Sequence, residues 1–363
     1  MKKLFLFALL AALCCSCTES NTDENTDPNG GSNSGQTTPP DPDSDAKDVI
    51  HVPKGGMLAG ILNELGLTEP SSLKLSGTLG ISDFTTLRNI QSLEHLDISR
   101  VNLSVLPTEA FLKCTNIKSV TLPNTLTAIG TQAFCGSSLV SISIPAGVKT
   151  IGNGTFNLCT SLQTVTFEKG SQLKAFENSS GWGGVFQSCT SLTTIEIPAS
   201  VETIGYNAFF GCSSLKTVTF EKGSQLKTID GFESCTSLTT IEIPASVETI
   251  KYSAFNGCTS LKTVTFEKGS QLKTVDGFSN CTALTTVDMS ACTQVTRIEY
   301  RAFYEDSKLQ LFKIGTRTPP SCGRNVFTGI NSYSVLKVPA GCVDAYKNAT
   351  GWKEFTTISE LDE

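Results

Sequence analysis

Apolar and polar positions in this chain repeat with a period of 23 residues over most of its length. Each repeat unit, here called a rung, carries one leucine or isoleucine in a C-T-S-L motif or its equivalent. These anchors follow one another at spacings of 22, 23, 30, 23, 23, 23 and 23 residues, so one seven-residue insertion interrupts the array. They are Ile117, Leu139, Leu162, Leu192, Leu215, Leu238, Leu261 and Leu284, with weaker copies at Leu73, Leu93, Leu309 and Leu336. Such a period predicts a solenoid of stacked rungs.

The order of side chains within one rung predicts a strand and two further short segments. Residues 192–197 (LTTIEI) alternate apolar and polar side chains, as in a strand with one buried face. Pro198 ends this strand because proline cannot donate to a ladder. The apolar pair Val201 and Ile204 follows, and residues 206–211 are long enough for one helical turn. Rungs that repeat in one direction predict a parallel sheet.

One phenylalanine and, in most rungs, one cysteine recur at fixed positions. Parallel side chains on strands about 4.8 Å apart are too distant for a disulfide, whose Cβ atoms lie about 3.8 Å apart. One cysteine per rung also cannot converge on zinc as four ligands do. We therefore predict a phenylalanine core and buried free thiols that act as small apolar groups. The phenylalanines are Phe111, Phe134, Phe156, Phe186, Phe209, Phe232, Phe255, Phe278 and Phe303, and the cysteines are Cys114, Cys159, Cys189, Cys212, Cys235, Cys258 and Cys281.

Three exceptions to the cysteine column lie at its margins. Cys135 is offset by a one-residue deletion, and Asp306 takes the place of the cysteine where the column ends. Cys322 and Cys342, in the C-terminal region, are the one pair for which a bridge merits a test.

The repeat unit resembles a known family. The pattern A-F-x-x-C-x-S-L-x-x-I-x-I-P-x-x-V-x-x-I-G, seen in residues 208–229, is similar to the BspA-like leucine-rich repeat family of bacterial surface lipoproteins. Residues 52–88 resemble its N-terminal cap. Residues 338–355 resemble its C-terminal cap, in which Tyr346, Trp352 and Phe355 would cover the last rung. The resemblance implies an α/β-type, right-handed leucine-rich repeat coil with a parallel sheet and two caps, and a role in adhesion or in binding host proteins.

The N-terminal residues have a different composition from the repeats. Lys2 and Lys3 precede ten apolar residues, too short a run to span a bilayer, which is typical of a secretory signal. Cys17 follows small residues and resembles the lipidated cysteine of bacterial lipoproteins; an ordinary cleaved signal is the alternative. Residues 18–48 contain no Val, Ile, Leu, Met or aromatic residue, which predicts a disordered acidic tether. An acidic stretch after such a cysteine also resembles surface-export signals, so we expect an outer-membrane lipoprotein exposed at the cell surface.

Charge separates the tether from the rest of the chain. The protein has 363 residues and a net charge of −6. Residues 18–48 carry eight acidic side chains and one lysine, a net charge of −7, so after the two leader lysines are counted residues 49–363 carry only −1. A nearly neutral domain without clustered positive charge argues against a nucleic-acid partner. We divide that domain into an N-terminal cap and first rungs (49–115), regular repeats (116–315), and a last rung with the C-terminal cap (316–363).

The outward strand positions form the candidate binding surface, because solenoids commonly bind through an extended sheet face. Rungs of two types alternate, so that Glu196, Glu242 and Asp288 recur every 46 residues among threonines. The alternative is that threonine only suits strands and the carboxylates only keep the sheet soluble. The candidate residues are Thr194, Glu196, Thr217, Thr219, Thr240, Glu242, Thr263, Thr265 and Asp288.

Aromatic residues outside the core offer a second candidate surface. Trp182 lies in the seven-residue insertion and is an enriched interface anchor if exposed, although it can equally fold back on a neighbouring rung. Tyr206, Tyr252 and Tyr300 share a column on alternate rungs. They form either an aromatic strip outside the sheet or packing between rungs.

The sequence offers little for catalysis. His51 and His95 are the only histidines and stand alone, and the chain has no glycine-rich phosphate loop or metal-ligand spacing. We expect neither catalysis nor a cofactor nor a metal. The predicted function is noncovalent binding of a host extracellular protein by a monomer attached to the membrane only through its lipid. Glycan capture for a surface uptake system and a spacer without a ligand are the alternatives.

Overall fold

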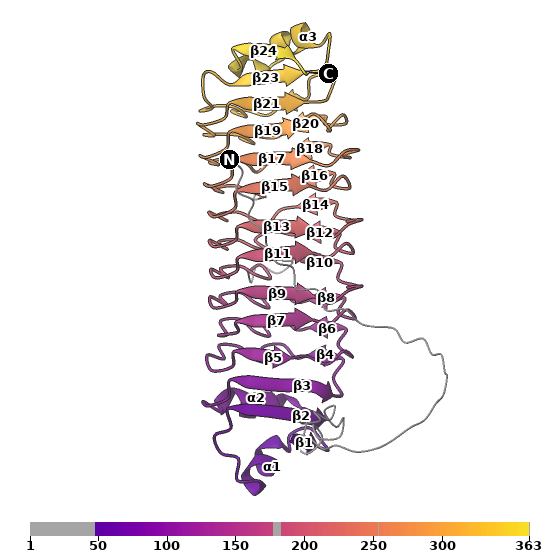
Figure 1. Cartoon of the computed structure of the whole chain (residues 1–363), viewed down its shortest axis with the longest axis vertical. Coiled ribbons are helices and arrows are strands. Elements are labelled where there is room, and N and C mark those ends of the chain that lie inside the picture. The colour runs from indigo at the N-terminus through magenta and orange to yellow at the C-terminus, as the bar shows by residue number, and fades with distance from the viewer. Residues whose placement is uncertain (1–47, 177–182, 253, 363) are drawn as a thin grey trace, which may run out of the picture. The chain divides into compact units, whose positions relative to one another are not determined.

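The computed structural model describes residues 48–176, 183–252 and 254–362. These residues form a right-handed parallel β-solenoid of about 13 rungs with about 23 residues each. Figure 1 shows the strands stacked one above another from β1 at one end to β24 at the other. The predicted fold is confirmed. The lipidation site Cys17, the tether over residues 18–47 and Trp182 lie outside the described residues.

Most rungs of the regular array contribute one long and one short strand. The long strands form the main face, and the short strands form a second sheet beside it. The long strands are β1 (Val49–Val52), β2 (Ser72–Gly77), β3 (His95–Val101), β5 (Ser119–Thr121), β7 (Ser141–Ile144), β9 (Thr164–Phe167), β11 (Thr194–Ile197), β13 (Thr217–Phe220), β15 (Thr240–Ile243), β17 (Thr263–Phe266), β19 (Thr286–Met289), β21 (Leu311–Ile314), β23 (Val335–Val338) and β24 (Thr357–Glu360). The short strands are β4 (Val105–Leu106), β6 (Ala128–Ile129), β8 (Thr150–Ile151), β10 (Ala175–Phe176), β12 (Thr203–Ile204), β14 (Thr228–Ile229), β16 (Thr249–Ile250), β18 (Thr274–Val275), β20 (Arg297–Ile298) and β22 (Ser321–Cys322).

Helices in the described residues lie only toward the two ends. They are α1 (Leu58–Glu64), α2 (Ile81–Asn89), α3 (Val343–Asn348) and the 3₁₀ helix η2 (Trp352–Glu354). Residues 206–211, which the sequence suggested as one helical turn, form hydrogen-bonded turns without a helix. A residue with positive φ stands two positions after most spine phenylalanines, as at Gly211 (φ 68°) and Ser234 (φ 60°). Left-handed backbone there bends the chain before a helix can propagate.

The phenylalanine core is confirmed as a continuous stack. From Phe111 to Phe303 consecutive rings lie nearly parallel, with centroids 4.9 to 5.6 Å apart. Phe327 extends the stack by one ring at 5.7 Å. Each ring is almost fully buried, which stabilises the fold by about 1.5–3 kcal/mol per side chain. Because the stack continues from rung to rung, one core serves the whole array.

The cysteine column is also confirmed as buried free thiols, but the thiols do more than fill space. Each thiol donates to the carbonyl oxygen of the phenylalanine one rung earlier, as Cys235 does to Phe209 (Sγ to O, 3.3 Å). Ser137 takes the column position in the rung where Cys135 is displaced, and its hydroxyl lies 3.4 Å from the Cys159 sulfur. The column therefore selects a small side chain with one donor.

Asp306 ends this column as a buried carboxyl. Its Oδ1 accepts the Cys281 backbone N–H at 2.8 Å, and its Oδ2 has no partner among the described residues. Burial raises the pKa of Asp306 well above its usual range.

Each end of the solenoid is closed by side chains that satisfy exposed backbone groups. Near the first strands, the buried Asp83 carboxylate accepts the N–H groups of Gly56 (2.6 Å), Leu58 (3.0 Å) and Gly80 (2.7 Å). At the other end Trp352 donates to the Pro320 carbonyl at 3.0 Å, its ring 5.3 Å from that of Phe327. Tyr346 and Phe355 are buried beside it, so the predicted aromatic cover of the last rung is confirmed.

Candidate functional site

The outward positions of the long strands form registered columns, as the repeat predicts. Thr194 pairs with Thr217 and Glu196 with Thr219 between β11 and β13. The same order recurs one repeat pair later, where Thr240 pairs with Thr263 and Glu242 with Thr265 between β15 and β17. The ladder between β17 and β19 continues the columns through Thr265 and Asp288. All nine candidate strand residues therefore lie on one face.

The candidates differ in how available their side chains are. Thr194, Glu196, Thr217, Thr219, Thr240 and Glu242 are exposed, whereas Thr263, Thr265 and Asp288 are half-buried. Lys313 on β21 approaches Asp288 with Nζ 2.9 Å from Oδ2, and the Ser290 hydroxyl donates to Oδ1 at 2.6 Å. Although burial opposes ionisation, these hydrogen bonds lower the pKa of Asp288. Glu196 and Glu242 make no side-chain hydrogen bond or ion pair with any described residue, so they are the available carboxylates of this face.

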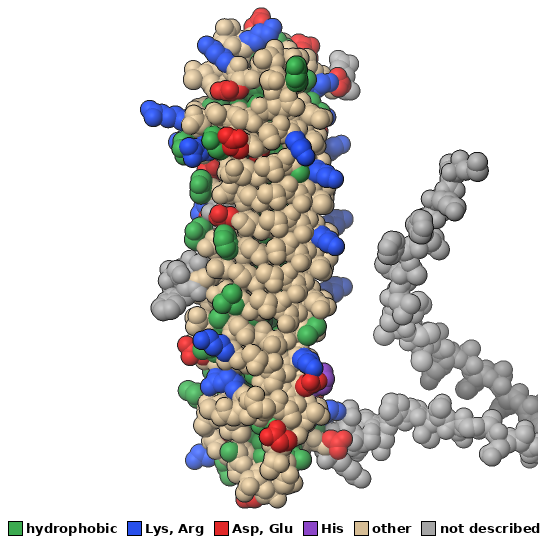
Figure 2. Space-filling view, turned by 90° about the vertical axis from the view of Figure 1, so that its left-hand side faces the viewer, with side chains coloured by type: hydrophobic (Ala, Val, Ile, Leu, Met, Phe, Trp, Pro, Cys, Tyr) green, Lys and Arg blue, Asp and Glu red, His purple; other side chains and the backbone are tan. Residues whose placement is uncertain are grey.

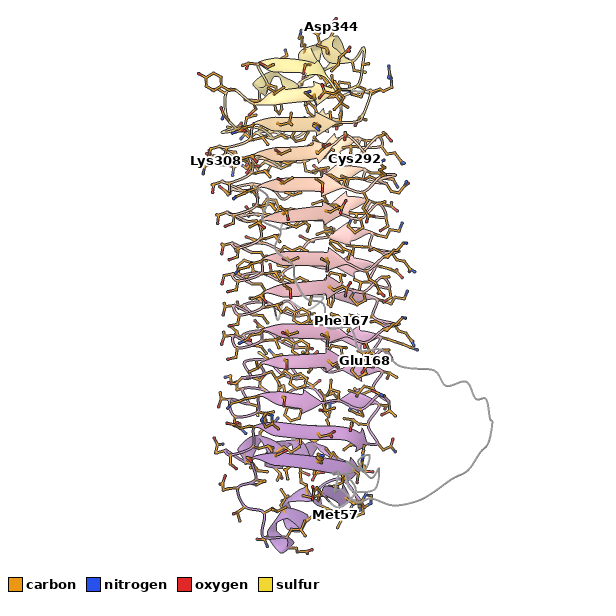
Figure 3. All side chains as sticks on the ribbon, in the orientation of Figure 1. Met57, Phe167, Glu168, Cys292, Lys308 and Asp344 are labelled. Carbon is orange, nitrogen blue, oxygen red and sulfur yellow. The ribbon has the colours of Figure 1, made fainter. Side chains whose placement is uncertain are left out.

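A second set of glutamates beside this face is committed to the fold. Glu168 lies where β9 ends (Figure 3) and accepts the Ala146 N–H of the preceding rung at 3.1 Å. Glu221 accepts the Ala199 N–H and Glu267 the Ala245 N–H, both at 2.9 Å. The repeated E-K-G-S-Q segment therefore uses its glutamate to satisfy the turn that follows the neighbouring strand.

The long-strand ladder is interrupted beside those segments. Backbone pairing stops between β9 and β11 and again between β13 and β15, although the short-strand sheet runs unbroken from β10 to β22. A hollow of about 270 Å³ lies at the first interruption and is lined by Phe167, Glu168, Lys169, Glu196 and Glu221, among others. The available carboxylate Glu196 thus stands beside a depression in the face.

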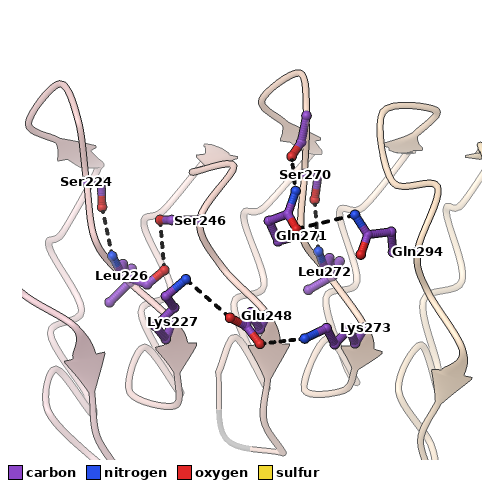
Figure 4. Close-up of polar contacts among 11 residues, drawn as sticks. Ser224, Leu226, Lys227, Ser246, Glu248, Ser270, Gln271, Leu272, Lys273 and Gln294 are labelled. Carbon is purple, nitrogen blue, oxygen red and sulfur yellow. Dashed lines mark hydrogen bonds and ion pairs between the residues drawn. The ribbon is translucent and has the colours of Figure 1, made fainter.

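The short-strand sheet carries a ladder of alternating charge, shown in Figure 4. Glu248 lies between two lysines, with its carboxylate 3.2 Å from Lys227 Nζ and 2.7 Å from Lys273 Nζ. Hydrogen bonds from Lys273 and Lys227 lower the pKa of Glu248. Lys174 and Glu202 form a similar pair at 2.8 Å. These charges are occupied with one another, which makes the edge a poor docking surface for a charged partner.

The tyrosine column lies outside the core. Tyr206, Tyr252 and Tyr300 are 53%, 56% and 46% exposed. Two carboxylates that sequence reasoning missed, Asp230 and Asp276, line a recess of about 430 Å³ with Tyr206 and Tyr252. Burial above all, opposed by the Gly277 N–H and aided by Glu299 and Asp230, raises the pKa of Asp276 to about 6.

The remaining nucleophiles and metal ligands are dispersed. Burial raises the pKa of Cys212 and of Cys258 to about 12, which leaves those thiols protonated and unreactive at neutral pH. Cys322 and Cys342 are both free thiols. His51 and His95 each contact a serine on the next strand, Ser76 (3.2 Å) and Ser119 (2.8 Å). Within residues 48–176, 183–252 and 254–362, no group of three His, Cys, Asp or Glu side chains could hold a metal ion.

The surface has no dominant charge. Figure 2 shows an array of uncharged atoms with acidic and basic side chains standing singly on the face in view. No helix of the described part is long and apolar enough to cross a membrane.

Comparison with known proteins agrees with the repeat. Six copies of the BspA type leucine rich repeat region match residues 82–180, 183–310 and 228–350. The chain belongs to the BspA-type leucine-rich repeat family. Leucine-rich repeat proteins of this type generally bind other proteins, are often associated with the cell surface and are typically not enzymes.

Several solved structures are similar to this BspA-type protein. A leucine-rich repeat protein from Bacteroides ovatus is 22% identical, with a TM-score of 0.48, over 86% of this chain and 92% of that one. The T. pallidum leucine-rich repeat protein is 26% identical, with a TM-score of 0.35, over 60% of this chain and 79% of that one. The pneumococcal vaccine antigen PcpA is 16% identical, with a TM-score of 0.38, over 81% and 80% of the two chains. No curated protein matches the chain significantly.

Proposed function

We propose that this BspA-type protein is a lipid-anchored surface adhesin that binds a host extracellular protein noncovalently through its long-strand face. The supporting observation is the pair of registered outward columns, in which exposed threonines alternate with the available carboxylates Glu196 and Glu242. An extended row of donors and acceptors on rigid strands suits a protein surface better than a small molecule. Anchorage through Cys17 and a tether of about 30 Å, from residues 18–48, would present this face away from the membrane.

Binding to a panel of host matrix proteins tests this function. The full-length chain, purified in detergent, is passed over immobilised matrix proteins and over serum albumin as the reference surface. We expect saturable binding to at least one matrix protein. A panel without any saturable binding would count against the adhesin.

A variant of the strand face locates the contact. Thr194→Arg with Thr240→Arg places two long cationic side chains on exposed positions of β11 and β15. We expect at least tenfold weaker binding, since a buried unmatched charge costs several kcal/mol. Thr259→Arg with Thr282→Arg puts the same charges on exposed turns and is the matched control. Equal losses in both variants would show that net charge, and not this face, governs binding.

A further inference from the structure

Alternate rungs differ in the length of chain between the short strand and the spine phenylalanine. Four residues separate Ile204 from Phe209, but only Asp230 and Gly231 separate Ile229 from Phe232. The same shortening recurs one repeat pair later. The shorter rungs fall back between the longer ones, so the recess described above opens between Tyr206 and Tyr252.

Glycine permits this shortcut. A Cβ on Gly231 would lie 2.7 Å from the Gly205 carbonyl oxygen and 2.9 Å from the Ala208 Cβ. At Gly277, where φ is +77°, a Cβ would lie 2.2 Å from the Lys251 carbonyl oxygen. Neither position accepts a side chain without moving backbone, so the recess is part of the fold.

Two aromatic rings border the recess at a fixed spacing. Tyr206 and Tyr252 occupy equivalent positions two rungs apart, which corresponds to about 10 Å along the solenoid. More than half of each side chain is exposed, and both line the hollow of about 430 Å³. That size lies within the range of small-ligand pockets, at about 300–1,000 Å³.

Polar groups of both signs lie between the rings. Asp230, Lys251 and Asp276 directly follow the strands β14, β16 and β18, so they form one column with the lysine between two carboxylates. An anionic ligand would face those carboxylates, and a cationic ligand would face the Lys251 ammonium. A neutral ligand rich in hydroxyl groups uses both, because each hydroxyl donates one hydrogen bond and accepts others.

The next interval along the column is closed. Arg301 lies over the Tyr300 ring with Cζ 5.0 Å from its centroid, and Arg297 pairs with Glu299 at 2.7 Å. The ring and the carboxylate of that rung are therefore engaged within the protein. Only the interval from Tyr206 to Tyr252 offers two exposed rings around polar groups that alternate in sign.

We propose that this recess is a carbohydrate-binding site for a neutral glycan, whose apolar sugar faces lie against Tyr206 and Tyr252 and whose hydroxyls bond Asp230, Lys251 and Asp276. The glycan runs along the solenoid axis, and the distance between the rings suits a short oligosaccharide segment. The site is separate from the long-strand face and does not depend on protein adhesion.

Affinity electrophoresis and calorimetry with neutral hexasaccharides of glucose, mannose, galactose and xylose test the proposal on the full-length chain in detergent. We expect at least one sugar to bind. Tyr206→Ala and Tyr252→Ala should each weaken that binding about tenfold, which is about 1.4 kcal/mol. Tyr300→Ala and Tyr333→Ala are the matched controls, because the first ring is covered by Arg301 and the second is 85% exposed near the C-terminal end. Both should bind as the parent does.

Lys251→Gln separates a glycan from a basic peptide. It leaves the rings in place, so we expect binding of the neutral sugar to fall and binding of hexalysine to stay undetectable. Binding of hexalysine that strengthens in this variant, without binding of any sugar, would overturn the proposal in favour of a cation site. A panel without any bound sugar, or equal losses in Tyr206→Ala and Tyr333→Ala, would overturn it as well. Failure here leaves the adhesin test unaffected, because the Thr194 and Thr240 variant concerns a different face.

Discussion

Inside the solenoid nearly every regular rung places a phenylalanine and a small donor side chain in the same two columns, whereas outside it alternate rungs differ in sequence and in path. Phe209 and Phe232 stack at 4.9 Å with nearly parallel rings, although one belongs to a rung with Tyr206 and the other to a rung with Asp230. Packing fixes the interior because each ring must match the rungs on both sides. The exterior is free of that constraint, so its differences are where binding specificity is found.

The largest effect should come from a gap in the phenylalanine stack. Phe232→Ala removes a ring that contacts Phe209 and Phe255, and we expect a loss of about 3–5 kcal/mol in the free energy of unfolding. Urea unfolding of the full-length chain measures it. Thr240→Ala, on the exposed face of the next rung, should change stability by no more than about 0.5 kcal/mol. Similar losses for both would refute the distinction between interior and exterior.

The end of the cysteine column should make stability depend on pH. The folded-state pKa of Asp306 lies well above its unfolded value of about 3.9, so its stabilising contribution is fully present below about pH 4 and is lost as pH rises toward the folded pKa. Asp306→Cys restores the column and removes that titration. The difference between the melting temperatures of variant and parent should therefore increase from pH 4 to pH 8. A difference independent of pH would contradict the buried ionisation.

A single thiol should matter less than a ring. Cys235→Ala loses the hydrogen bond to the Phe209 carbonyl and leaves a small cavity, for which we expect about 1–2 kcal/mol. Cys235→Ser should cost less, because Ser137 already occupies this column in another rung. Urea unfolding of the two variants gives the order. Greater loss for serine than for alanine would show that the column needs only apolar volume.

The smallest effect should come from the charge ladder on the short strands. Glu248→Gln breaks two exposed ion pairs, so the melting temperature should fall slightly at pH 7 and by less at high salt. Because the folded-state pKa of Glu248 is lowered, its contribution is present above its unfolded value and is lost as pH falls through the folded value. Glu202→Gln, which removes one pair, is the control. Equal effects in the two variants would show that the lysines on both sides of Glu248 do not act together.

The interior could be predicted from the sequence because its period is uniform. Phenylalanine and cysteine recur every 23 residues through most of the array, and this spacing alone gave the stack and the thiol column. The recess between Tyr206 and Tyr252 was missed for a physical reason. The Asp-Gly shortcut at Asp230 is compensated by a longer E-K-G-S-Q segment in the same rung, so the overall period hides both changes. Counting residues from each short strand to the next spine phenylalanine would have revealed it.

The available carboxylates were predictable in position but not in availability. Alternation along the strand placed Glu196, Glu242 and Asp288 in one column. Only the structure shows that Lys313, which pairs with Asp288 on the neighbouring strand, occupies the third carboxylate. Whether a charge is free depends on its neighbour one rung away, which the local pattern does not contain.

Converting one rung type into the other on the outside alone tests most directly whether binding belongs to the exterior. Glu196→Thr with Glu242→Thr makes the long-strand face uniform and leaves every spine phenylalanine and column cysteine in place. We predict a free energy of unfolding within about 0.5 kcal/mol of the parent for each change, and at least tenfold weaker binding to the matrix protein identified in the panel. Unchanged binding in a variant of unchanged stability would contradict the assignment of recognition to this face.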